Sequence, residues 1–127
     1  ANFLVNTGAD CTTLMPADVL RLNIPASQLR GVLPVSGIVG QVIYFQEEAM
    51  LLFAEGNSTI RAYSIQIGIA PINSNSNYTL PSLLGQEILR NWRMRHDPTA
   101  GRLEFTVKSS DFTFRGNLAT VANKLVL

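Results

Sequence analysis

The chain has one cysteine in 127 residues, and this scarcity excludes two kinds of stabilisation at once. Cys11 cannot form an internal disulfide bond, and a single thiol leaves too few soft ligands for a zinc site. The fold must therefore rest on packing, and the length predicts a single domain over residues 1–127 with a modest core. A reducing, cytoplasmic setting is the simplest expectation from this cysteine usage.

Charge and long apolar runs are also scarce. Charged residues make up 15% of the chain and the net charge is +1, so there is no basic field to hold nucleic acid or an anionic membrane. No stretch approaches the roughly 20 apolar residues of a membrane helix, and the N-terminus lacks the basic and then apolar pattern of a signal peptide. We therefore expect neutral or weakly charged partners, with neither nucleic acid nor membrane among them.

Short apolar runs separated by glycine, proline and asparagine are what the sequence has instead. This pattern is typical of a mostly β fold. The Asp-Pro-Thr-Ala-Gly segment at 97–101 predicts a turn, and hence a hairpin, between residues 92–96 and 102–107. The predicted strands cover residues 2–5, 41–45, 49–53, 60–69 and 102–107.

Helical patterns are few. Residues 16–22 have the apolar spacing of one or two turns, with Pro16 at a position that suits the first turn of a helix. Residues 85–92 make the stronger case, because Ile88, Leu89 and Trp92 fall on one helical face. The sequence therefore predicts one main short helix, and the asparagine-rich segment 72–80 predicts a solvated loop.

Three separated segments form a recognisable set. The first follows an apolar run and reads Asn-Thr-Gly-Ala, the second is rich in glycine, and the third places two leucines before a glycine. The segments are Asn6–Ala9, Ser36–Gly40 and Ser82–Leu89. Together they resemble the signature loop, the flap tip and the segment leading into the main helix of retropepsin-like aspartic peptidases of the bacterial and cellular branch.

This resemblance implies a fold and an activity. The fold would be a closed, barrel-like sheet with a flap hairpin and one main short helix, and the protein would act as a homodimer. Its activity would be cleavage of extended peptides or protein substrates in a cleft under the flaps, without a metal or other cofactor. The family usually has a further strand or hairpin before the signature loop, which would be trimmed, removed by processing or supplied as a separate N-terminal fragment. Residues 112–127 and the neighbouring hairpin are the candidates for the dimer interface.

Asn6 stands where the resemblance implies the catalytic aspartate. In the family two carboxyl groups, one from each subunit, flank a water and share a proton, because two like charges so close cannot both ionise. One carboxylate acts as base and the other carboxylic acid polarises the scissile carbonyl. An amide can do neither. Thr7 would brace the loop across the dimer, and Gly8 would allow close backbone approach. The form with Asn6 is therefore expected to be inactive.

The remaining site residues are expected to bind substrate. A mobile apolar flap tip would close over a peptide and exclude water. Val39 departs from the family, where glycine is common, and this implies a stiffer flap. Gly85 would let the helix and a strand cross closely beneath the active loop. The substrate-binding candidates are Ala9, Gly37, Ile38, Val39, Gly40 and Leu84.

Other hypotheses remain open. A natural pseudopeptidase that binds peptides or serves as a dimerisation module would carry Asn6 in its own gene, whereas an engineered change would not. An unrelated small β-barrel with a chance Asn-Thr-Gly-Ala segment predicts no two-fold cleft. Asp10 lies beyond the glycine turn and is expected to be solvated or structural. His96 is expected at the surface, and Cys11 has no evident base for a nucleophilic mechanism.

Overall fold

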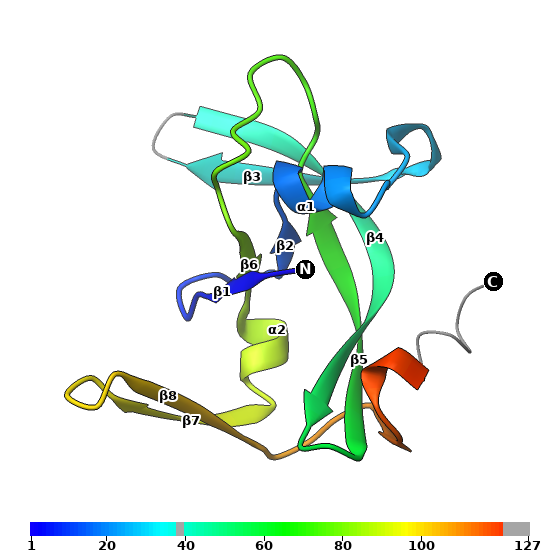
Figure 1. Ribbon diagram of the computed structural model, residues 1–127. Coiled ribbons are helices and arrows are strands. Elements are labelled where there is room, and N and C mark those ends of the chain that lie inside the picture. The colour runs from blue at the N-terminus through cyan, green and yellow to red at the C-terminus, as the bar shows by residue number, and fades with distance from the viewer. Residues whose placement is uncertain (38–39, 121–127) are drawn as a thin grey trace. The chain divides into compact units, whose positions relative to one another are not determined.

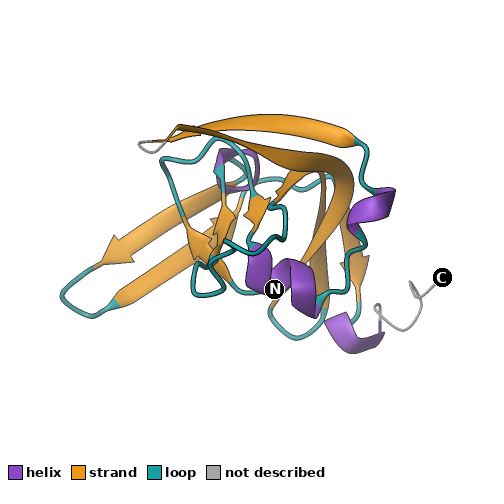
Figure 2. Ribbon diagram, turned by 90° about the horizontal axis from the view of Figure 1, so that it is seen from above, coloured by secondary structure: helices purple, strands orange, loops and turns teal. Residues whose placement is uncertain are grey.

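The computed structural model describes residues 1–37 and 40–120, and the chain is mostly β (Figures 1 and 2). Across these residues no helix is both long enough and apolar enough to cross a membrane. The strands are β1 (Phe3–Val5), β2 (Thr13–Leu14), β3 (Gly31–Gly37), β4 (Gly40–Glu55), β5 (Thr59–Ile69), β6 (Ser82–Leu84), β7 (Trp92–Asp97), β8 (Arg102–Val107) and β9 (Phe112–Arg115). The helices are α1 (Pro16–Arg21), the 3-10 helix η1 (Ala26–Gln28) and α2 (Gln86–Leu89).

The chain divides into two compact units. The first comprises Ala1–Ala49 and Gln66–Leu89, and the second comprises Met50–Ile65 and Arg90–Leu127. Strands β4 and β5 each contribute residues to both units. The segments that resemble the signature loop, the flap and the entry to the main helix all belong to the first unit.

The main sheet is open, so the expectation of a closed barrel was wrong. Its strand order is β1-β6-β2-β5-β4-β3, with β9 paired to β5 off this path. Closure of a sheet requires its first and last strands to pair. Within residues 1–37 and 40–120, β1 pairs only with β6, and β3 pairs only with β4. Strands β7 and β8 form a separate two-stranded sheet.

Several predicted elements are present with closely similar bounds. Strand β5 covers 59–69, where the sequence predicts a strand at 60–69, and β7 and β8 form the predicted hairpin. Helix α1 covers most of the predicted 16–22 segment. Strand β9, in the stretch considered for the dimer interface, pairs with β5 of the same chain, and residues 121–127 lie outside the described part.

Two elements differ from prediction. The separate strands expected at 41–45 and 49–53 are one strand, β4, because the intervening Gln-Glu-Glu has no turn-forming residue. Instead Glu47 accepts a hydrogen bond from the Arg30 backbone N–H at 2.7 Å. Helix α2 ends at Leu89, short of the predicted Trp92. The Asn91 carbonyl accepts hydrogen bonds from the N–H groups of residues 108 and 109. The backbone at Asn91 is therefore paired with the segment after β8 and not with a continuing helix.

The buried face of β5 changes along its length. In the second unit Ile60 and Ala62 are fully buried, whereas in the first unit Ile67 and Ile69 are buried. The change comes at Tyr63, which is itself 1% exposed. The core of the first unit is completed by Leu14, Met15, Val19, Ala70, Leu84, Ile88 and Leu89.

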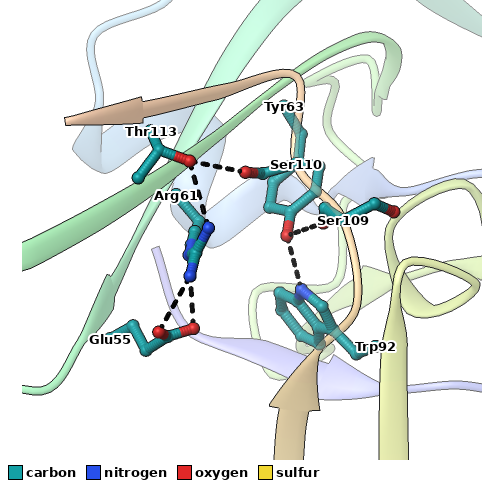
Figure 3. Close-up of polar contacts among 7 residues, drawn as sticks. All are labelled: Glu55, Arg61, Tyr63, Trp92, Ser109, Ser110 and Thr113. Atoms are coloured by element: carbon teal, nitrogen blue, oxygen red, sulfur yellow. Dashed lines mark hydrogen bonds and ion pairs between the residues drawn. The ribbon is translucent and has the colours of Figure 1, made fainter.

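A polar network holds the second unit together (Figure 3). The Tyr63 hydroxyl donates to the Ser109 carbonyl and accepts from Trp92 Nε1, each at 2.8 Å. Arg61 forms two hydrogen bonds to the Glu55 carboxylate and donates to Thr113 Oγ1 at 3.1 Å. These contacts join β5 to the segment before β9, to β9 itself, to β7 and to the end of β4.

Candidate active-site loop

Asn6 lies directly after β1, at the start of a tight loop. Strands β1 and β6 lie side by side and run parallel (Figure 1). Val5 is opposite Leu84, and the Asn6 N–H donates to the Leu84 carbonyl at 3.1 Å. The Asn6 side-chain Oδ1 accepts from the Gly8 N–H at 3.0 Å, and the Asn6 carbonyl accepts from the Ala9 N–H at 3.1 Å. The loop therefore turns around the residue at the expected catalytic position.

The segment after β6 holds the far side of this loop. The Gln86 N–H donates to the Ala9 carbonyl at 2.8 Å, and Gln86 Nε2 donates to the Thr7 carbonyl at 2.7 Å. Asn6 and Ala9 are partly buried, whereas Thr7 and Gly8 are exposed. The loop is thus anchored at both ends, with its tip accessible to a ligand or to a second copy of the chain.

Gly85 allows two backbone segments to cross beneath the loop, as expected. A Cβ atom at this position would lie 2.5 Å from the Cys11 carbonyl carbon and 2.9 Å from the Thr12 nitrogen. The Gly85 N–H donates to Thr12 Oγ1 at 3.0 Å, and the Glu87 carboxylate accepts a hydrogen bond from the Thr12 N–H. No side chain fits at position 85 unless the Cys11–Thr12 backbone moves.

The flap candidates are only partly described. Gly37 and Gly40 are paired at the end of the β3–β4 hairpin, while Ile38 and Val39 lie outside the described residues. Leu84 is 3% exposed and meets the Asn6 loop through its backbone carbonyl. The structure therefore brings Leu84 to Asn6, and it brings the two flap glycines to each other.

The sequence also offers Asp10, Cys11 and His96 as ionisable candidates. Asp10 is exposed, beyond the glycine turn. Burial raises the pKa of the Cys11 thiol, and the Glu87 and Asp10 carboxylates raise it further, so this thiol is a poor nucleophile at neutral pH. His96 lies exposed on β7, in the second unit. Over the described residues, no group of three or more metal-ligating side chains is placed to hold a metal ion.

Sequence reasoning missed three residues that brace the loop, namely Thr12, Gln86 and Glu87. Each forms a hydrogen bond to a residue more than 70 positions away in the sequence, so local periodicity could not predict it. Two of the three could have been predicted from their position. Gln86 and Glu87 directly follow the Leu-Leu-Gly segment that was expected to pass beneath the loop, which places them near it.

Comparisons with protein-family models, with curated proteins and with solved structures found no match.

Proposed function

We propose that this chain is a retropepsin-type aspartic endopeptidase that works as a homodimer and is inactive here because Asn6 replaces the catalytic aspartate. The observation that carries the proposal is the setting of Asn6. Asn6 follows a short parallel strand, its Oδ1 accepts a hydrogen bond from the Gly8 N–H, and the rest of its loop is anchored through the bond from Gln86 to the Thr7 carbonyl. A residue held in this way at an accessible loop is suited to meet its counterpart from a second subunit.

The proposed reaction divides the work between two carboxyl groups. With aspartate at position 6 of both subunits, the pair would share one proton and titrate with two apparent pKa values. The carboxylate would take a proton from the attacking water while its protonated partner donates to the scissile carbonyl. The substrate would be an extended peptide bound beside the flap strands, with Gly37 and Gly40 framing the flap tip. No cofactor takes part, and the lone Cys11 agrees with a cytoplasmic setting.

Asn6 is expected to preserve the loop while removing the proton transfer. Its Oδ1 accepts the Gly8 N–H in the way that a carboxylate oxygen could. The carboxamide neither takes up nor releases a proton near neutral pH. Loss of general acid and base assistance alone costs about 10²-fold to 10⁴-fold in rate.

The test is the restored variant Asn6→Asp, assayed against a mixed peptide library at about pH 4 to 6, where a carboxyl pair shares one proton. We expect cleavage at least about 10²-fold faster than with the Asn6 chain, and a bell-shaped dependence on pH. The double variant Asn6→Asp with Asp10→Asn is the matched control and should keep the activity. Sedimentation should show that the restored protein is dimeric. Absence of cleavage by that dimer would refute the proposal.

A pseudopeptidase is the second candidate, because the loop is formed with the amide in place and the Asn6 Oδ1 accepts the Gly8 N–H. In that case the Asn6→Asp dimer would bind library peptides as the Asn6 chain does, without cleaving them. The same experiment therefore separates the two functions.

A further inference from the structure

The first unit contains a pocket of about 470 Å³ that none of the site residues line. This volume lies within the range of roughly 300 to 1,000 Å³ that is usual for small-molecule sites. Strand β4, the start of α1 and the segment between β5 and β6 form its walls. The apolar part of the lining is Met15, Pro16, Val42, Ala70, Pro71 and Leu80, and the polar part is Tyr44 with asparagine and serine residues of the 73–77 segment.

This pocket and the Asn6 loop lie toward opposite ends of β6. At one end the Met15 N–H donates to Ser82 Oγ at 2.9 Å, and Met15 lines the pocket. At the other end the Leu84 carbonyl accepts from the Asn6 N–H. None of the described residues that line the pocket belongs to the Asn6 loop.

Among the described residues that line the pocket, none carries a charged side chain. The Tyr44 hydroxyl contacts the Met15 sulfur at 3.9 Å. A charged ligand would lose hydration on entering and would gain no opposite charge in return. The lining therefore selects for an uncharged ligand with an apolar body.

The rim supplies hydrogen-bond donors. Asn73 Oδ1 accepts from the Asn75 N–H at 2.8 Å, and Asn77 Oδ1 accepts from the Thr79 N–H at 2.9 Å. These bonds engage the oxygen of each carboxamide, whereas each Nδ2 has two N–H groups to donate. The turns also fix the two side chains in place. A ligand group beside this rim is best matched when it is an acceptor, such as a carbonyl oxygen.

We propose that this pocket binds a small uncharged molecule with an apolar body and a carbonyl acceptor. The body lies against the apolar walls, including Val42 of β4, and the carbonyl faces the donors of Asn73 and Asn77. Because Val42 and Tyr44 belong to the flap strand, a bound ligand also braces that strand near Gly40. The proposal does not depend on the peptidase activity.

Two matched probes test the ligand chemistry. N-acetylphenylalaninamide is neutral, and N-acetylphenylalanine has the same body with a carboxylate. We expect the neutral probe to shift the backbone amide signals of Val42, Tyr44, Ala70 and Leu80 in NMR titrations of the 127-residue chain with Asn6 in place. The charged probe should bind at least tenfold more weakly. Equal affinity for both probes, or shifts confined to other parts of the chain, would overturn the proposal.

Two neighbouring variants test the location. Val42→Trp fills the pocket from a residue that is 52% exposed, and it should weaken the neutral probe at least tenfold. Ile43→Trp is the control, because Ile43 is 62% exposed, does not line the pocket and points from the other face of β4. Leu80→Trp fills the pocket from its loop side, and it should weaken the probe similarly even where Val42→Trp does not fold. If Leu80→Trp and Ile43→Trp both bind the probe like the unaltered chain, the assignment is wrong.

Discussion

Gly85→Ala is the sharpest test of how the Asn6 loop is supported. The added Cβ would lie 2.5 Å and 2.7 Å from the carbonyl carbon and oxygen of Cys11, where carbon contacts need about 3.5 to 4.0 Å. Backbone must therefore move by roughly 1 Å, and the Gly85 hydrogen bond to Thr12 Oγ1 is strained at the same time. Overpacking costs about 1 to 3 kcal/mol and a lost hydrogen bond about 1 kcal/mol, so we expect destabilisation of about 3 kcal/mol.

Urea unfolding measures this change. With a slope of about 1 to 3 kcal/mol per molar urea, a loss of about 3 kcal/mol lowers the midpoint by about 1 to 3 M. Gly101→Ala is the control, because a Cβ there meets nothing within 4 Å and the cost comes only from its φ of +62°. That cost is about 1 to 2 kcal/mol. If Gly85→Ala is no more destabilising than Gly101→Ala, the argument from close crossing is refuted.

Three further predictions concern groups outside the loop. Burial raises the pKa of the Asp18 carboxyl, but the Ser82 hydrogen bond and the Arg21 guanidinium outweigh it, so the pKa lies below its ordinary value of 3.8. The stability that Asp18 contributes is therefore present above pH 3.8 and is lost as the pH falls through the folded-state pKa. Asp18→Asn should lower the free energy of unfolding by about 1 to 3 kcal/mol at pH 7. The free energy of unfolding of this variant should also fall less steeply below about pH 4 than that of the unaltered chain. Tyr63→Phe should lower the free energy of unfolding by about 1 to 3 kcal/mol, because the Trp92 indole N–H loses its acceptor. The fluorescence of Trp92, the single tryptophan, should shift for the same reason. An unchanged emission spectrum and an unchanged urea midpoint would contradict this. Cys11 should react with iodoacetamide more slowly than free cysteine at pH 7, and equal rates would contradict its raised pKa.

The local features of the fold could be predicted from sequence because they depend on neighbouring residues. The turn at 97–101 fixes the β7–β8 hairpin, and Pro16 marks the beginning of α1. The pairing of β1 with β6 could not be predicted from periodicity, because its partners are 79 positions apart, as in Phe3 opposite Ser82. The closed barrel was an implication of the family resemblance, and the three short segments that carry this resemblance do not say whether the outer strands of the sheet pair.

The candidate site divides in the same way. The small residues of the Asn6 loop and the close crossing at Gly85 follow from residue size, and both were predictable. The bracing by Gln86 required knowledge of which carbonyl groups lie within its reach. The pocket beside Tyr44 was not predicted, because its walls come from three segments that meet only in the folded chain.

The proposed peptidase requires two copies of residue 6 to meet across a two-fold axis. A crystal structure of the chain with Asn6 in place, grown under conditions where sedimentation shows a dimer, would place both copies of this residue. We predict two Asn6 carboxamides within hydrogen-bonding distance, about 3 Å, of each other or of one shared water. A dimer whose Asn6 side chains face away from the axis, or a protein that stays monomeric at crystallisation concentrations, would contradict the claim.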